Sequence, residues 1–341
     1  DVVIELSEVA GVDIMVDLTL TGTATETGDY TISSKSVILP AGQKSITVSI
    51  DTVNDALDEI VENISISASA SDGVIIGSQA TANLDILDND PPPTANVRVD
   101  NFTLDELGGQ AIMTVQLSQA SGRDVVFDIS LAGKAISDVD YSISAQQLVV
   151  PAGSTTASVL IQTIDDSVFE DDEEIQIFVS AADSDTVDFT DQTLTLNLID
   201  NEARPSVSLV SDVTSIAEAD GVATITATLS GLSDSDVVVQ TSIVGQGDVT
   251  SDDFSVSSTS IVIPAGQLSG SITITATNDP FVEQDGVVGL TVTSVTGNFQ
   301  TLPDQLSITI IDDDEGRLLI TSAADPIVVG EDGSTAEFSV N

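Results

Sequence analysis

The sequence contains no cysteine, no histidine and no tryptophan, and only seven of its 341 residues are lysine or arginine. Without cysteine or histidine there can be no disulfide, no thiolate nucleophile, no Ser-His-Asp triad and no cysteine- or imidazole-bound metal. Its longest apolar runs are too short to predict a membrane span. The seven basic residues face 56 acidic ones, which gives a formal net charge of −49. Such a charge argues against nucleic-acid binding, which needs basic side chains to neutralise phosphates, and favours small cations as partners.

Apolar residues make up 41% of the chain, but aromatic residues only 3%. Acidic disordered chains lack this apolar content, so we expect an ordered protein. Its cores must be built from valine, isoleucine, leucine and alanine. With no histidine, cysteine or tryptophan to build a catalytic centre or a sugar-stacking cleft, we do not expect an enzyme.

The sequence repeats with a period of 111 to 113 residues. Three separate landmarks share this period: an Asp-aromatic pair, a Pro-Ala-Gly turn and an acidic triplet. The pairs begin at Asp29, Asp140 and Asp253, the turns at Pro40, Pro151 and Pro264, and the triplets at Asp88, Asp200 and Asp312.

Within each repeat, apolar residues alternate with polar ones, as in 46–50, 64–68, 194–198 and 271–275. This period of two, with many β-branched residues, predicts strands with one buried face. About seven strands per repeat predict an all-β chain of tandem β-sandwiches with an immunoglobulin-like architecture. The linkers after the acidic triplets are short, so we expect an elongated, semi-rigid rod.

The repeats divide the chain at the acidic triplets. We expect a first repeat at 1–90 that lacks its first strand, complete repeats at 91–202 and 203–314, and the opening strands of a fourth at 315–341. Two interpretations remain open. The chain is a slice of a longer tandem protein, or residues 317–341 of one copy complete the first repeat of the next by donor-strand complementation.

Each repeat also carries an acidic loop after an alternating strand, in which an aspartate is followed four positions later by a glutamate. Repeats one and two add a second glutamate three positions further on. Crowded carboxylates repel one another and need a compensating cation. Several hard oxygen ligands fit Ca²⁺ better than Mg²⁺, which demands a tighter octahedron.

Together, these landmarks resemble the Calx-beta domain, whose pattern has an Asp-Tyr turn, a Pro-x-Gly turn, an acidic loop and a terminal acidic triplet in this order. The resemblance covers nearly the whole chain. It implies seven-stranded immunoglobulin-like sandwiches that bind Ca²⁺ in loops at one end, as in sodium–calcium exchangers, integrin β4 and large bacterial surface proteins.

The resemblance also implies a set of Ca²⁺ ligands in each repeat. In repeat three, Gly286 replaces the second loop glutamate, so we expect fewer or weaker ions there unless Asp285 compensates. In repeat two Asn201 can add an oxygen, and Glu331 in the tail occupies the first-strand position that repeat one lacks. The implied ligands are Asp29, Asp55, Glu59, Glu62, Asp88 and Asp90 in repeat one; Glu106, Asp140, Asp166, Glu170, Glu173, Asp200 and Glu202 in repeat two; Glu218, Asp253, Asp279, Glu283, Asp312, Asp313 and Asp314 in repeat three; and Glu331 in the tail.

The sequence therefore predicts a Ca²⁺-stiffened structural region of an extracellular bacterial surface adhesin or matrix filament. Its expected partners are calcium ions and further repeats or copies of itself joined end to end. The alternatives are a Ca²⁺-sensing regulatory module and a metal-free spacer.

Overall fold

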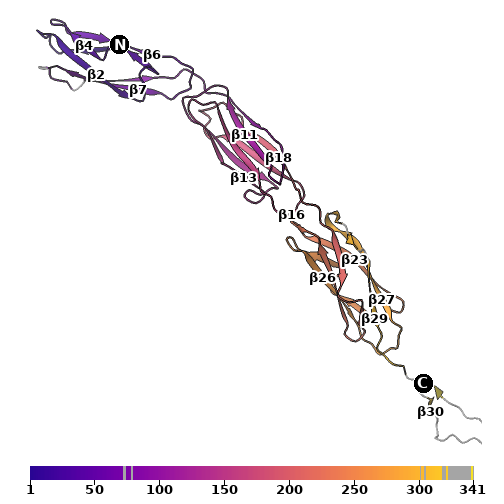
Figure 1. Cartoon of the computed structure of the whole chain (residues 1–341). Coiled ribbons are helices and arrows are strands. Elements are labelled where there is room, and N and C mark those ends of the chain that lie inside the picture. Colours follow the sequence, from indigo (N-terminus) through magenta and orange to yellow (C-terminus); the bar gives the residue numbers. More distant parts are fainter. Residues whose placement is uncertain are drawn as a thin grey trace, which may run out of the picture. The chain divides into compact units, whose positions relative to one another are not determined.

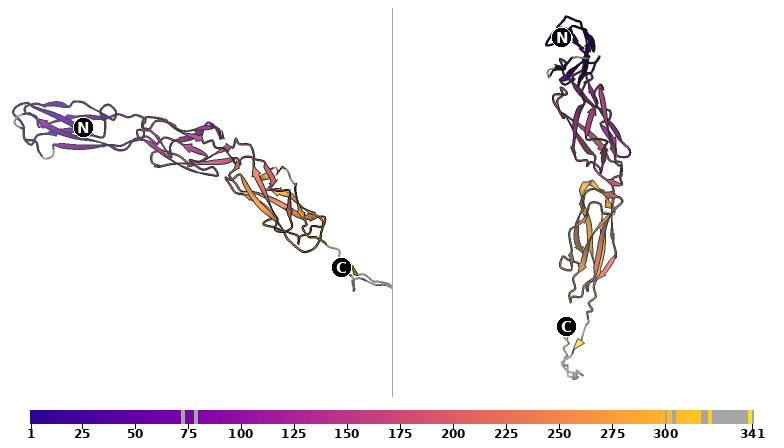
Figure 2. Two further views of the ribbon diagram at one scale, coloured as in Figure 1. Left: turned by 60° about the horizontal axis from the view of Figure 1, so that its bottom comes forward. Right: turned by 90° about the vertical axis from the view of Figure 1, so that its left-hand side faces the viewer.

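The computed structural model describes residues 1–71, 74–77, 80–299, 301–302, 305–316, 320–321 and 339–340. Their regular secondary structure consists of strands and one short 3₁₀ helix, η1 (Thr296–Asn298). The strands of each repeat lie in two layers (Figures 1 and 2). The chain divides into two compact units. The first unit comprises 1–165 and 173–199, and the second comprises 166–172 and 200–341.

Repeat two is a complete sandwich of a five-stranded and a four-stranded sheet. The five-stranded sheet has the order β10-β18-β17-β12-β14, and the four-stranded sheet has the order β13-β15-β11-β9. The expected seven strands are present. Two of them are interrupted, and each of these two contributes one segment to each sheet: β9 and β10 are the segments of one, and β13 and β14 those of the other. The strands are β9 (Ala95–Val99), β10 (Thr103–Asp105), β11 (Gln110–Leu117), β12 (Val125–Gly133), β13 (Tyr141–Ile143), β14 (Gln147–Val150), β15 (Thr156–Thr163), β17 (Glu173–Ala181) and β18 (Gln192–Ile199).

Repeat three repeats this strand order and adds one strand, β28, which pairs in parallel with β19 at the edge of the second sheet. Its sheets are β20-β29-β27-β23-β25 and β24-β26-β21-β19-β28. Its strands are β19 (Val207–Ser211), β20 (Ser215–Ala217), β21 (Val222–Leu229), β22 (Leu232–Ser233), β23 (Val237–Gln246), β24 (Phe254–Val256), β25 (Ser260–Ile263), β26 (Ser269–Ala276), β27 (Gly286–Val295), β28 (Thr301–Leu302) and β29 (Gln305–Ile311). The short strand β22 pairs in parallel with β16 (Val168–Phe169), a strand of the segment 166–172 that belongs to the second unit.

Repeat one has a four-stranded sheet, β4-β2-β7-β8, and two strand pairs, β1-β5 and β3-β6. In repeat two, β9 and β10 cover the outer edges of β11 and β18. Among the described residues, no strand covers the corresponding edges of β1 and β8. The strands are β1 (Val2–Glu5), β2 (Ile14–Gly22), β3 (Tyr30–Ile32), β4 (Ser36–Leu39), β5 (Ser45–Val48), β6 (Ile50–Thr52), β7 (Glu62–Ala70) and β8 (Thr81–Ile86).

The period-two pattern produces the cores as expected. Strand β11, for example, alternates exposed and buried positions and buries Met113 and Val115 completely. Tyr30 and Tyr141 are buried among the aliphatic side chains of their repeats. The Pro-Ala-Gly turns place Gly42 and its counterparts at positive φ, where glycine is favoured.

The predicted fourth repeat is described only in part. Strands β30 (Ile320–Thr321) and β31 (Ser339–Val340) pair antiparallel. The rest of the predicted strand 336–340, and Glu331, lie outside the described residues. No helix among the described residues is long and apolar enough to cross a membrane.

Candidate metal sites

All six predicted ligands of repeat one line a single cavity of about 360 Å³ at one end of its sandwich. Asp29 precedes β3 and Glu59 lies on the acidic loop that leads into β7. Glu62 is the first residue of β7, and the triplet follows β8. The carboxylate oxygens of Asp29, Glu59 and Glu62 lie within 4.8 Å of one another. The topology therefore brings together residues that are up to 61 positions apart. The lining contains Asp29, Asp55, Glu59, Glu62, Asp88 and Asp90, together with Asp85, Asn54 and Asn89.

Local hydrogen bonds fix the loops around this cavity. The backbone nitrogen of Thr25 donates to Asp29 Oδ2 at 2.5 Å, and that of Leu57 donates to Asp55 Oδ1 at 2.9 Å. Asp88 accepts from the backbone nitrogen of Glu59 at 3.2 Å. The acidic triplet is therefore tied to the acidic loop, and the carboxylates face the cavity from fixed backbone positions.

The carboxylates of this cavity repel one another. Burial, a hydrogen bond with Asp29 and the charges of Asp29 and Glu59 raise the pKa of Glu62 to about 7. Burial and the charges of Asp29, Asp55, Asp88 and Asp58 likewise raise the pKa of Glu59. Burial by itself would raise the pKa of Asp29 as well. The hydrogen bonds that Asp29 accepts from Thr25 outweigh burial and lower the pKa of Asp29 below its usual value. A proton on Glu62 partly relieves the repulsion, and a bound cation would relieve it more completely.

The donors around the cavity suit Ca²⁺. They are carboxylate and carboxamide oxygens, with no lysine or arginine among the lining residues. Ca²⁺ takes six to eight oxygen ligands in flexible geometry, whereas Mg²⁺ is usually held by one or two carboxylates and keeps several waters. The number of carboxylates here therefore favours Ca²⁺.

Repeat three assembles a smaller group. Oxygens of Glu218, Asp312 and Asp314 lie within 4.8 Å of one another. Asp279 joins them through its backbone nitrogen, which donates to Glu218 Oε1 at 2.9 Å. This bond lowers the pKa of Glu218, but burial and the contact with Asp312 outweigh it, so the pKa is raised. Asp312 Oδ1 and Asp314 Oδ2 are buried without a hydrogen-bond partner among the described residues, as expected of oxygens that would face a cation.

The other predicted ligands of repeat three do not form a comparable group among the described residues, and Gly286 explains why. A Cβ at Gly286 would lie 2.2 Å from Val249 Cγ2, so Val249 occupies the space that the second loop glutamate fills elsewhere. Asp285 Oδ1 accepts from the backbone nitrogen of Asp312 at 3.3 Å, which ties Asp285 to the acidic triplet, and its role as a substitute ligand stays a prediction. The backbone nitrogen of Thr250 donates to Asp253 Oδ2 at 2.6 Å. Glu283 is exposed, and partial loss of hydration together with the charges of nearby aspartates raises its pKa. Asp313 is exposed as well.

The predicted ligands of repeat two are divided between the two units. Glu106, Asp140 and Glu173 belong to the first unit and are buried, while Asp166, Glu170, Asp200 and Glu202 belong to the second. The gathering of these seven residues around one ion therefore stays a prediction.

Within the first unit, Lys134 lies 2.9 Å from Glu173 Oε1, a contact that sequence reasoning missed. Glu173 Oε2 is buried without a hydrogen-bond partner among the described residues. Repeat two thus has a lysine side chain of its own beside one predicted ligand, whereas no lysine or arginine lines the cavity of repeat one.

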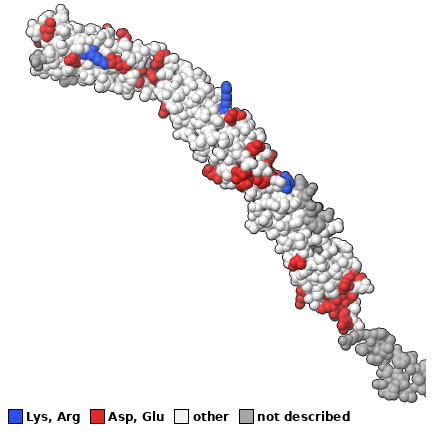
Figure 3. Space-filling view, viewed as in Figure 1, with Lys and Arg blue, Asp and Glu red and all other residues white. Residues whose placement is uncertain are grey.

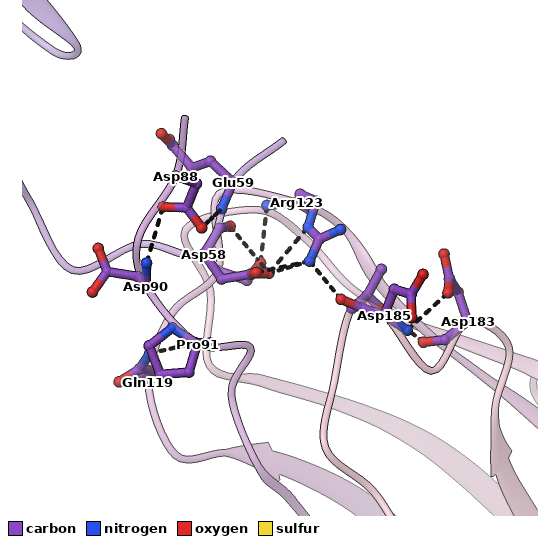
Figure 4. Close-up of polar contacts among 11 residues, drawn as sticks. Asp58, Glu59, Asp88, Asp90, Pro91, Gln119, Arg123, Asp183 and Asp185 are labelled. Carbon is purple, nitrogen blue, oxygen red and sulfur yellow. Dashed lines mark hydrogen bonds and ion pairs between the residues drawn. The ribbon is translucent and has the colours of Figure 1, made fainter. Parts of the chain in front are cut away.

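The acidic loop of repeat one also contacts repeat two, which sequence reasoning did not anticipate. Asp58 is only 4% exposed, and its carboxylate accepts from Arg123 Nε at 3.0 Å and from Nη2 at 2.6 and 2.8 Å (Figure 4). Ser121 Oγ donates to the same carboxylate at 3.2 Å, and Arg123 also donates to the carbonyl of Asp185. We call Asp58, Ser121, Gly122 and Arg123 the first joint.

A candidate ligand takes part in this joint. A Cβ on Gly122 would lie 2.5 Å from Glu59 Cγ, so the side chain of Glu59 packs against the backbone of repeat two.

The acidic side chains of the visible surface gather in patches rather than spreading evenly, one of them at the end of repeat three (Figure 3). Sequence reasoning also missed Asp85 in the lining of the repeat-one cavity, because it occupies an exposed position of an alternating strand.

The Calx-beta domain family matches residues 1–90, 88–202 and 200–314. No curated protein matches the chain. Among solved structures, the CBD12 structure from CALX1.2 is 14% identical with a TM-score of 0.29, and the match covers 64% of this chain and 99% of that one. The apo-form Calx CBD1 domain is 15% identical with a TM-score of 0.28, covering 32% and 99%. The CBD12 structure of CALX1.1 is 14% identical with a TM-score of 0.27, covering 61% and 82%. With three successive matches that follow its three sandwiches, the chain belongs to the Calx-beta domain family.

Proposed function

We propose that this chain is a calcium-binding structural region of an extracellular surface protein, an adhesin stalk or a matrix filament, in which Ca²⁺ stiffens the joints between repeats. Calx-beta domains are binding and structural modules and often extracellular. The observation that carries the proposal is that one loop of repeat one lines the acidic cavity and also forms the first joint.

The mechanism follows from the position of this loop. Without an ion, the negative charges of nearby aspartates repel the carboxylate of Glu59, and this repulsion favours spreading of the loop. These aspartates are Asp29, Asp55, Asp88 and Asp58. A bound Ca²⁺ would draw these carboxylates together and fix the backbone on both sides of Asp58. Because Asp58 holds Arg123 of repeat two, fixing the loop also fixes the joint. At a Ca²⁺ concentration 1,000 times its Kd, one such site adds about 4 kcal/mol to stability.

Thermal unfolding in EDTA, in millimolar Ca²⁺ and in matched Mg²⁺ tests the proposal. We expect a large rise of the midpoint in Ca²⁺ alone. Equal midpoints in all three buffers would refute calcium stiffening and leave a metal-free spacer. Calorimetric titration separates the remaining alternative, because a regulatory sensor needs an affinity near resting cytosolic Ca²⁺ and a millimolar affinity excludes that role.

The open strand edges of repeat one support a second element of the proposal, assembly by strand complementation. Val2, Ile4, Leu84 and Ile86 are half-buried, whereas Met113, Val115, Leu196 and Leu198 at the corresponding positions of repeat two are buried under β9 and β10. We infer that residues 317–341 of a second copy cover these edges. Deleting them should abolish polymers and leave repeats two and three folded, whereas polymers that persist after the deletion would contradict the inference.

A further inference from the structure

The acidic loops of repeats one and two make the same backbone contact with the repeat that follows. In the first joint, the backbone nitrogen of Gly122 donates to the carbonyl of Asp58 at 2.9 Å. In the second unit, the backbone nitrogen of Asp234 donates to the carbonyl of Phe169 at 3.2 Å, and strands β16 and β22 pair in parallel. Asp58 and Phe169 therefore occupy equivalent positions, but one side chain is charged and the other is aromatic.

Phe169 packs against the hydrophobic core of repeat three, although by sequence it lies in repeat two. Its ring meets that of Phe299 edge-on, with the ring centroids 5.9 Å apart. Phe299 is only 8% exposed and belongs to the same core. Aromatic pairs in this geometry stabilise a structure beyond the apolar area that they bury. This packing explains why segment 166–172 groups with repeat three.

Arg204 holds this aromatic pair from the linker that follows the acidic triplet of repeat two. Its guanidinium carbon lies 4.9 Å from the ring centroid of Phe169 and 5.7 Å from that of Phe299. The same guanidinium pairs with Asp171 at 3.1 Å and donates to the carbonyl of Gly297. It therefore contacts the loop segment twice and repeat three twice. We call Phe169, Arg204 and Phe299 the aromatic clasp.

The two contacts differ in how they depend on the acidic groups around them. The carboxylate of Asp58 is one of the charges that repel Glu59, so the first joint is coupled to the charge of the neighbouring cavity. Phe169 carries no charge, and a guanidinium that stacks on aromatic rings needs no carboxylate. The pair of Arg204 with Asp171 is exposed and contributes little. A cation that neutralises carboxylates should therefore change the first joint far more than the clasp.

We propose that the aromatic clasp fixes the acidic loop of repeat two to repeat three whether or not Ca²⁺ is bound, so that calcium controls only the first joint of these two. The loop that carries the predicted ligands Asp166 and Glu170 is then held in place before any ion arrives. The contrast with the first joint rests on the proposed function, which it narrows, whereas the clasp itself does not depend on it.

Amide hydrogen exchange of the 341-residue chain, resolved by residue with NMR in EDTA and in millimolar Ca²⁺, tests the clasp. The amides of Gly122 and Asp234 are matched reporters, because each donates to the central loop carbonyl of its contact. In the unchanged chain, removal of Ca²⁺ should speed the exchange of Gly122 at least tenfold and change that of Asp234 less than twofold. Phe169→Ala should speed the exchange of Asp234 at least tenfold in both buffers and leave Gly122 unchanged.

Further variants separate the clasp from a general loss of packing. Phe178→Ala is the matched control, since Phe178 is 39% exposed on β17 and lies outside the clasp. Arg204→Ala should speed the exchange of Asp234 as Phe169→Ala does. Phe169→Leu should have a smaller effect than Phe169→Ala, because leucine keeps most of the apolar volume but loses the ring.

Two results would overturn the proposal. The first is an exchange of Asp234 that rises in EDTA by the same factor as that of Gly122, because an ion would then hold both contacts. The second is a Phe169→Ala variant in which Asp234 exchanges no faster than in Phe178→Ala. If Gly122 ignores Ca²⁺ while Asp234 still depends on Phe169, calcium stiffening of the first joint fails and the clasp stands.

Discussion

The buried ion pair of the first joint gives a prediction that can be worked through quantitatively. The Asp58 side chain is 5% exposed and the Arg123 side chain 22% exposed. Arg123→Ala leaves the Asp58 carboxylate with Ser121 Oγ as its remaining side-chain partner among these contacts. Removing one partner of a buried pair costs about 3–5 kcal/mol, so we expect a loss near 3 kcal/mol.

The reverse substitution should cost less. In Asp58→Ala, Arg123 keeps its bond to the carbonyl of Asp185 and part of its hydration, so we expect a loss of about 1–2 kcal/mol, near that of one or two hydrogen bonds. The double variant should be about as stable as Asp58→Ala, because no buried charge remains in it. The cycle then gives a coupling energy of about 3 kcal/mol, equal to the loss expected for Arg123→Ala and at the upper end of the range for residues in contact.

Urea unfolding followed by tyrosine fluorescence measures this loss in the right place. Tyr30 and Tyr141 are the only tyrosines, and they lie in repeats one and two. Arg98→Ala is the matched control, since Arg98 is exposed on β9 of the same repeat. A loss no larger than that of Arg98→Ala, or a coupling energy near zero, would refute the reasoning.

Four further predictions concern the acidic sites and the turns. In EDTA, the stability of repeat one should fall as pH rises from 5 to 8, because Glu62 binds its proton more tightly in the folded state, with a pKa of about 7, than in the unfolded state; Ca²⁺ should remove this fall, and a flat EDTA profile would count against it. Glu62→Gln should raise the EDTA midpoint and reduce the Ca²⁺-induced rise, since it removes repulsion and a ligand together; thermal scans in both buffers measure this, and an unchanged Ca²⁺ response would contradict it. Gly286→Glu should lower the stability of repeat three without adding an ion in calorimetric titration, because Val249 fills the space; a new ion would show that the space is available. Gly153→Ala should cost about 1–2 kcal/mol in urea, because alanine resists the positive φ of this turn, and a neutral result would mean that the turn relaxes.

Much of the architecture was predictable from the sequence because the signal was repeated. The period of about 112 residues, the alternating strands and the Pro-Ala-Gly turns predicted tandem β-sandwiches, and the sheets of repeats two and three confirm this fold. The grouping of Asp29 with Glu59 and Glu62 was also predictable, since the resemblance aligned these positions and a sandwich brings its loops together at one end.

What the sequence could not supply were contacts that depend on which side chain fills a space. Asp58 looks like one more acidic residue in an acidic loop, yet it points into the joint rather than into the cavity. A comparison of repeats offered one clue, because this position is aspartate, phenylalanine and valine while Glu59 keeps its acidic counterparts. Likewise, the packing of Val249 over Gly286 joins positions 37 residues apart, and nothing in the local pattern indicates it.

The measurement that tests the central claim most directly is the distance distribution between spin labels on repeats one and two. The chain has no cysteine, so labels at Thr19→Cys and Ser130→Cys, exposed positions on β2 and β12, are unambiguous. Double electron–electron resonance should give a narrow distribution in Ca²⁺ and a broad one in EDTA and in Mg²⁺. The same width in all three buffers would contradict the account, because the joint would then be rigid or flexible without regard to the ion.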